Sequence, residues 1–149
     1  MEDTESIVPF LETLKELMED RGLNIAGLSA AVSCDQSAIR RWFGERYYPE
    51  PETLIRLAEL FGCSVDYLFG LTDVAEFTPA CDGRGFYGRF CELKRALGVS
   101  DYRVARECGL RKSTVSKWRE VKSPETVSLL RLASFFNCSL EFLLGRSKE

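Results

Sequence analysis

The sequence contains no histidine among its 149 residues, and its six cysteines form no Cys-x-x-Cys pair. Because zinc sites usually combine histidines with closely spaced cysteines, a zinc centre is not expected. The chain also lacks a nucleophile elbow and a glycine-rich phosphate loop. These absences argue against an enzyme, and nothing in the sequence implies a cofactor.

Long apolar runs are also missing. The longest runs contain only a few residues, whereas a bilayer-spanning helix needs roughly 20, so no membrane partner is expected. The segment Met1-Glu2-Asp3-Thr4-Glu5 is acidic where a secretory signal would be basic. With 45% hydrophobic residues, the chain is expected to be a globular, cytoplasmic protein.

Charge is distributed unevenly along the chain. Residues 1–75 hold 6 basic and 14 acidic side chains, a net charge of -8. Residues 76–149 hold 14 basic and 9 acidic side chains, a net charge of +5, and the two values sum to the overall -3. Such asymmetry indicates that the two halves have different partners.

The most specific feature is an internal repeat. Residues 54–70 align with residues 129–145 at a shift of 75 positions, and nine of the 17 aligned pairs are identical. Trp42 aligns with Trp118 at a shift of 76, and the one-residue difference falls in a loop. The repeat predicts a first domain at residues 1–73, a linker at 74–85 and a second domain at 86–149.

Each copy is expected to contain five short helices. Apolar spacing predicts a first helix at residues 8–21, and Phe90, Leu93 and Leu97 as the inward positions of its counterpart. Pro51 and Pro124 are expected in the first turns of the fourth helices. Gly22 and Gly98 are expected to end the first helices, and the expected N-caps are Asn24, Ser64, Ser100, Ser123 and Ser139.

The stretch from Leu110 to Trp118 is predicted to form the third helix of the second copy. Val115 and Trp118, three positions apart, give it an inward apolar stripe, and its other side is basic and rich in hydroxyl groups. A helix with such a face fits the major groove of B-DNA. A solvated surface helix would have the same pattern.

These helices resemble the lambda-repressor-like, Xre-type helix-turn-helix family. The second copy is the closer match, through Leu97-Gly98-Val99-Ser100, Val104-Ala105 and the segment 109–118. The first copy matches at Gly22-Leu23, Leu28, Ile39, Trp42, Pro49 and residues 54–68. The resemblance implies an all-α fold with two tandem five-helix lambda-repressor-like helix-turn-helix domains.

The resemblance also implies that the second helix of each motif contacts double-stranded DNA in the major groove. In the second copy, the residues expected to read bases are Arg111, Lys112, Ser113 and Lys117. The residues expected to contact phosphate or sugar are Thr114, Ser116 and Lys122. In the first copy, Gln36 is expected to pair with adenine, and the other expected DNA contacts are Ser37, Arg40, Arg41 and Arg46.

Two features depart from the family pattern. Many relatives place a phosphate-binding glutamine at the start of the second helix. This chain has Ile25 there, which cannot hydrogen-bond, and Asp101, which is expected to repel phosphate. Asp35 and Glu45 flank the recognition helix of the acidic first copy, which disfavours approach to a polyanion. The second copy is therefore expected to be the main DNA reader. The first copy is either a weaker reader or a surface for pairing with another protein or with itself.

The expected function is a sequence-specific transcriptional regulator that represses by excluding polymerase from a promoter. The alternative is a protein-interaction or antitoxin-like module that keeps the fold with little affinity for DNA.

Overall fold

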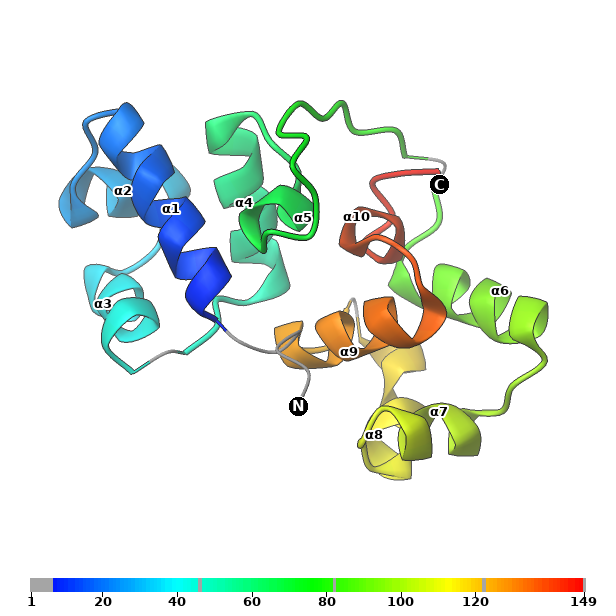
Figure 1. The fold of residues 1–149 in the computed structure, drawn as a ribbon. Coiled ribbons are helices and arrows are strands. Elements are labelled where there is room, and N and C mark those ends of the chain that lie inside the picture. The colour runs from blue at the N-terminus through cyan, green and yellow to red at the C-terminus, as the bar shows by residue number, and fades with distance from the viewer. Residues whose placement is uncertain (1–6, 46, 82, 122, 149) are drawn as a thin grey trace. The chain divides into compact units, whose positions relative to one another are not determined.

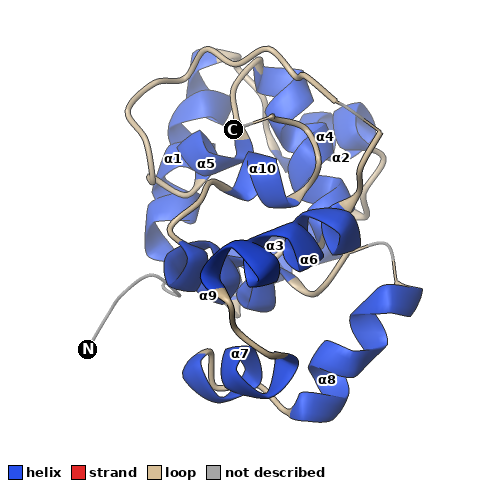
Figure 2. Cartoon of the chain, turned by 90° about the vertical axis from the view of Figure 1, so that its right-hand side faces the viewer, coloured by secondary structure: helices blue, strands red, loops and turns tan. Residues whose placement is uncertain are grey.

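The computed structural model describes residues 7–45, 47–81, 83–121 and 123–148 (Figure 1). The chain divides into two compact units, the first ending at Thr78 and the second beginning at Pro79. The described residues form ten α-helices, so the fold is all-α as predicted. Their one β pairing is an isolated bridge between Cys63 and Glu76, and Figure 2 shows helices joined by loops. No described helix has the length and apolarity needed to cross a membrane.

The first unit contains five α-helices whose apolar sides face a common core. They are α1 (Val8–Asp20), α2 (Ile25–Val32), α3 (Gln36–Gly44), α4 (Pro51–Phe61) and α5 (Val65–Leu68). Phe10 of α1 lies at the centre, with its ring 6.3 Å from Trp42 of α3 and 5.2 Å from Phe69. Leu28, Leu57 and Leu68 are fully buried around it. The helical spacing of the apolar residues therefore places them in one core.

The second unit repeats this order of helices with one addition. It contains α6 (Phe86–Leu97), α7 (Asp101–Glu107), α8 (Lys112–Ser116), the 3-10 helix η1 (Lys117–Glu120), α9 (Thr126–Phe136) and α10 (Leu140–Leu143). The indole of Trp118 lies edge-on to Phe86 at 5.4 Å and to Phe90 at 5.2 Å. Because Phe86 aligns with Phe10 and Trp118 with Trp42, the aromatic centre of the core recurs in both units.

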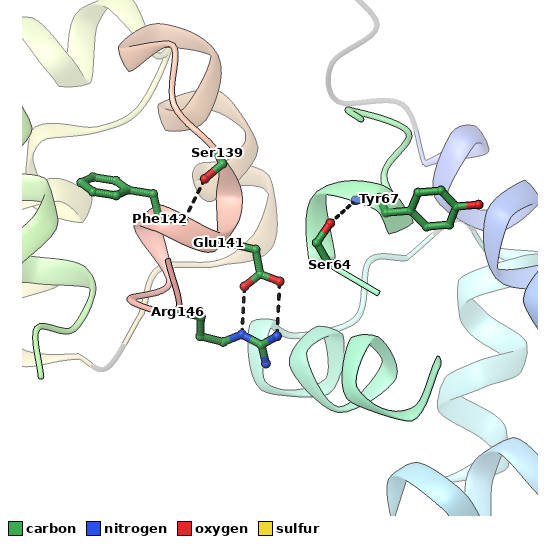
Figure 3. A network of polar contacts seen from close by, with 6 residues as sticks. All are labelled: Ser64, Tyr67, Ser139, Glu141, Phe142 and Arg146. Atoms are coloured by element: carbon green, nitrogen blue, oxygen red, sulfur yellow. Dashed lines mark hydrogen bonds and ion pairs between the residues drawn. The ribbon is translucent and has the colours of Figure 1, made fainter. Parts of the chain in front are cut away.

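Most of the predicted helix ends are confirmed. Gly22 and Gly98 have left-handed backbones, with φ of 64° and 68°, which a glycine adopts without steric cost. Four of the five predicted N-caps accept a backbone N–H three residues later, and Figure 3 shows two of these bonds. The distance from the donor nitrogen to the capping side-chain oxygen is 2.8 Å for Asn24, 2.9 Å for Ser64, 3.2 Å for Ser100 and 3.0 Å for Ser139.

Three expectations for the second unit are wrong. Helix α9 begins at Thr126 with Glu125 as its N-cap, so Ser123 is not the N-cap, and Pro124 precedes the helix and does not lie in its first turn. Pro124 instead aligns with Pro49, and both prolines are buried beside an N-cap glutamate. Leu97 is 53% exposed. Leu97 aligns with Arg21, which follows the inward-facing apolar residues of α1. At this position the end of the helix faces solvent.

Contacts between distant parts of the sequence recur at aligned positions. In the first unit, Nη1 of Arg56 donates to the carbonyl oxygen of Val32 at 3.4 Å. In the second, Nη1 of Arg131 donates to the carbonyl oxygen of Cys108 at 3.3 Å. Each bond connects the fourth helix to the carboxyl end of the second. The aligned sequences therefore make the same tertiary bond in each unit.

The segment 74–85, predicted to be a linker, contributes to both units. Glu76 forms the bridge with Cys63, whereas the N–H of Ala80 donates to the carbonyl oxygen of Arg146 at 2.8 Å. A Cβ atom at position 145 would collide with the carbonyl oxygen of Arg84, so this close approach requires Gly145, whose φ is 79°. The boundary between the compact units thus falls inside the predicted linker. The domain limits themselves remain a prediction.

An ion pair is buried at the carboxyl end of the second unit. Nε of Arg146 donates to Oε1 of Glu141 at 2.9 Å, and Nη2 donates to Oε2 at 3.3 Å (Figure 3). Both side chains are buried. Because the two groups are joined by two hydrogen bonds in a bidentate arrangement, each charge compensates for the hydration that the other loses on burial. The aligned residues of the first unit, Asp66 and Leu71, cannot form such a pair.

Ser33 offers a stability test, since it has a left-handed backbone with φ of 54° between α2 and α3. Its aligned residue, Gly109, has φ of 66°. Ser33→Gly removes a left-handed penalty of roughly 1–2 kcal/mol and adds a chain-entropy cost of about 0.5–1 kcal/mol. We expect the free energy of unfolding of the first unit to rise by up to about 1.5 kcal/mol, measured by urea denaturation. Ala30→Gly, inside α2, is the control and is expected to lower it.

Candidate nucleic-acid interface

In the first unit, α2 and α3 form a helix-turn-helix with α3 held against the core. Ile39 and Trp42 of α3 are buried, at 0% and 3% exposure. The cap at Asn24 begins α2, and the left-handed Ser33 turns the chain into α3. Because one side of α3 is occupied by the core, the residues on its other side face solvent.

The exposed side of α3 carries the residues predicted to contact DNA: Gln36, Ser37, Arg40 and Arg41. Nη2 of Arg40 donates to Oε1 of Gln36 at 3.1 Å. The guanidinium of Arg41 lies 5.3 Å from the ring centre of Tyr47, an exposed residue after the helix. Both arginines are therefore held by neighbours on the solvent side. Arg46, also predicted to contact DNA, lies outside the described residues.

In the second unit, α7 and α8 occupy the positions that align with α2 and α3. Val115 and Trp118 are buried as predicted, at 1% and 3% exposure, and Gly109 makes the turn. Among the predicted contact residues, Thr114 is half-buried. Those that are exposed are Arg111, Lys112, Ser113, Ser116 and Lys117. Lys122 lies outside the described residues. The two-sided character predicted for this segment is confirmed.

Helix α8 is shorter than predicted. It ends at Ser116, and the chain continues as a 3-10 helix from Lys117 to Glu120. The hydroxyl of Ser116 donates to the carbonyl oxygen of Lys112 at 3.0 Å, a bond that bends or ends helices. The run Ser113-Thr114-Val115-Ser116 also has a low helix propensity. Lys117 is therefore presented from a tighter turn than its aligned residue Arg41, which remains in α3.

Asp101 was expected to repel phosphate at the start of α7. The structure pairs its carboxylate with the ammonium group of Lys94. Nζ of Lys94 also lies 4.7 Å from the ring centre of Phe90, which holds it in place. Lys94 aligns with Met18, a buried apolar residue of the first unit. The second unit therefore replaces a core methionine with a cation that compensates this carboxylate.

Two arginines that sequence reasoning missed extend the basic surface onto α7. Arg103 and Arg106 are exposed, and the guanidinium of Arg106 lies 5.9 Å from the ring centre of the exposed Tyr102. Their aligned residues in the first unit, Gly27 and Ala30, are uncharged. The signal available in the sequence was the spacing of three residues, which puts both arginines on one side of the helix.

Arg131 and Arg56 position the turns of the two motifs. Nη1 of Arg131 donates to the carbonyl oxygen of Gly109 at 3.2 Å as well as to that of Cys108.

Burial raises the pKa of the Cys108 thiol to about 11, and burial together with Asp35 raises the pKa of the Cys34 thiol. Both thiols beside the turns are therefore protonated at neutral pH, so they are weak nucleophiles.

Acidic residues flank the recognition helix of the first unit, as the sequence indicated. Asp35 and Glu45, on either side of α3, are both exposed. Nothing acidic is exposed on α8 itself, although Glu120 follows at the end of η1. Helices α3 and α8 therefore have different local charges.

Comparison with known families identifies one of the two motifs. Residues 14–68 match the family model Helix-turn-helix, of the Xre type, whose members are typically non-enzymatic DNA-binding regulators. The match falls on the first unit, and a second copy is not detected. The second copy had been expected to resemble the family more closely than the first. The second unit departs from the first at Lys94 and in the shortened α8. No curated protein and no solved structure matches the chain.

Proposed function

We propose that this protein is a sequence-specific transcriptional regulator that binds double-stranded DNA with two tandem helix-turn-helix units. One observation carries the proposal. At aligned positions, α3 and the α8–η1 segment each bury an apolar residue and a tryptophan and expose a polar face. That arrangement holds a short helix rigidly while leaving donors free to reach base edges in a major groove.

The second unit is the main DNA reader in this proposal. Arg111, Lys112 and Lys117 are exposed, and within the described residues no carboxylate pairs with them. Arg103 adds positive charge from α7, and so does Arg106, whose Nη2 also lies 3.3 Å from Oε2 of the exposed Glu107. Neutralising phosphates releases counterions, which is the main source of affinity for DNA. The first unit, with its acidic flanks, contributes less binding free energy.

Two units in one chain can bind neighbouring sites, and the second binding event then benefits from a high effective concentration. A dimer would instead present two second units at half-sites about one turn of DNA apart, about 34 Å. In either arrangement the bound protein would occupy a promoter and exclude polymerase. Repression in the cytoplasm is therefore the mode of action that we propose.

A protein-interaction role is the second candidate. It is favoured by the exposed side of α1 in the first unit, which carries Glu12, Glu16, Glu19 and Asp20. Such a surface suits a basic protein partner, or a second copy of this chain through its own basic unit. The chain would then act as an antitoxin-like module with little affinity for DNA.

Salt dependence separates the two functions. Genomic fragments retained by the purified protein supply a duplex, whose affinity is then measured by fluorescence anisotropy between 50 and 200 mM salt, the range in which the effect is large. Five or six phosphate contacts predict a log–log slope of roughly -4 to -5. The variant Arg103→Gln/Arg106→Gln is expected to make the slope shallower by about 2. A flat response, or no retained DNA at low salt, would support the interaction module.

A further inference from the structure

The exposed side of α3 carries a side-chain pair that changes what its glutamine can recognise. Nη2 of Arg40 donates to Oε1 of Gln36 at 3.1 Å. The two residues are four positions apart, so they lie on the same side of the helix. Both are exposed, and neither takes part in the core.

The bond fixes the orientation of the Gln36 amide. A guanidinium group has five N–H donors and no acceptor, so it can bind only the amide oxygen. The NH₂ group of Gln36 therefore points away from Arg40. One lone pair of the oxygen is engaged by a cation, whose charge disfavours a second partial positive donor there. The donors that the pair presents are the amide NH₂ and the remaining guanidinium N–H groups.

Bases differ in what they offer to such a surface. A free glutamine recognises adenine by donating to N7 and accepting from N6, and the second step needs its amide oxygen. Guanine offers two acceptors, N7 and O6, to the major groove. A cationic pair that presents mainly donors is therefore complementary to guanine and less well matched to adenine, which must also donate from N6.

The second arginine of α3 does not compete for Gln36. The guanidinium of Arg41 lies 5.3 Å from the ring centre of Tyr47, and the N–H of Tyr47 donates to the carbonyl oxygen of Arg41 at 3.3 Å. In the second unit the aligned residues are Lys112 and Ser116, and the Ser116 hydroxyl bonds to a backbone oxygen. The glutamine–arginine pair is therefore a feature of the first unit alone.

We propose that the Gln36–Arg40 pair makes the first unit select guanine at the base that Gln36 faces, where a lone glutamine would select adenine. This inference rests on the proposed function and assigns to the acidic unit a role in sequence discrimination. Arg40 acts here as a specificity-determining residue, because it decides which group of Gln36 is presented to DNA.

The test is binding-site selection from random duplexes by the full chain and by Arg40→Ala. The wild type is expected to select guanine at one position, and Arg40→Ala to select adenine there while the other positions keep their preferences. On two duplexes that differ only at this base pair, the preference should reverse from about tenfold for guanine to about tenfold for adenine. Adding Gln36→Ala to Arg40→Ala should abolish the preference at that position.

Lys15→Ala, which removes an exposed positive charge from α1 of the same unit, is the control and should leave the selected base unchanged. Circular dichroism checks that Arg40→Ala folds like the wild type, as expected for an exposed residue. An equal loss of affinity for both duplexes would show that Arg40 contacts only phosphate, and an unchanged preference would show that Gln36 does not read a base; either overturns the inference alone. A wild type that selects no sequence would overturn the proposed function as well.

Discussion

The double variant Lys112→Ala/Lys117→Ala is expected to bind its DNA site roughly 30-fold to more than 10,000-fold more weakly than the wild type. Each good contact to a base edge is worth about 1–3 kcal/mol. Both side chains are exposed on the polar side of the α8–η1 segment, opposite Val115 and Trp118. Fluorescence anisotropy with the selected duplex measures the loss. Because neither lysine lies in the core, the urea midpoint of the second unit should not change.

The matched control is Gln36→Ala/Arg41→Ala at the aligned positions of the first unit. It should weaken binding less, since the first half of the chain has a net charge of -8 and the second half +5. If the first-unit variant lost more affinity than the second-unit variant, the assignment of the second unit as the main reader would be wrong. Equal losses would contradict it too.

Trp118→Ala is expected to unfold most of the second unit while leaving the first unit folded. The indole is 3% exposed and contacts two phenylalanine rings edge-on, Phe86 at 5.4 Å and Phe90 at 5.2 Å. Truncating a buried tryptophan costs about 3–5 kcal/mol, partly because the cavity does not close. That loss is comparable to the whole stability of a small domain, at the lower end of about 5–15 kcal/mol.

The chain provides its own probe for this experiment, because its two tryptophans lie one in each compact unit. In Trp118→Ala the remaining fluorescence comes from Trp42 and should keep the wild-type urea midpoint. Circular dichroism should show loss of the helices of the second unit. The reciprocal variant, Trp42→Ala, should unfold the first unit and spare Trp118. If Trp42 instead unfolded early in Trp118→Ala, the two units would not be independent domains.

Much of the fold was predictable because it depends on local interactions. Asn24, Ser64, Ser100 and Ser139 act as N-caps because their side-chain oxygens reach N–H groups only three residues away. The burial of Trp42 and Trp118 follows from helical spacing. The start of α9 was missed because Pro124 suits a first helical turn as well as the position before a cap.

Parts of the interface could not be predicted because they depend on which groups the fold brings together. Lys94 and Asp101 lie on different helices, and only their pairing shows that this carboxylate is compensated. Arg40 and Gln36 are neighbours on any helix, but only the bond between them shows that the amide oxygen is engaged. Arg131 reaches across from α9 to the turn before α8.

By itself, the sequence determined that this protein is all-helical, that a pattern occurs twice in it, and which side of α3 and of the α8–η1 segment is polar. Those properties come from side-chain periodicity and from hydrogen bonds between near neighbours, which any stretch of chain carries with it. The tertiary structure decided where α8 passes into a 3-10 turn, which charges are compensated and that residues of the predicted linker pack against each unit. These depend on long-range contacts, such as the approach of Arg84 to Gly145, that exist only once the chain has folded.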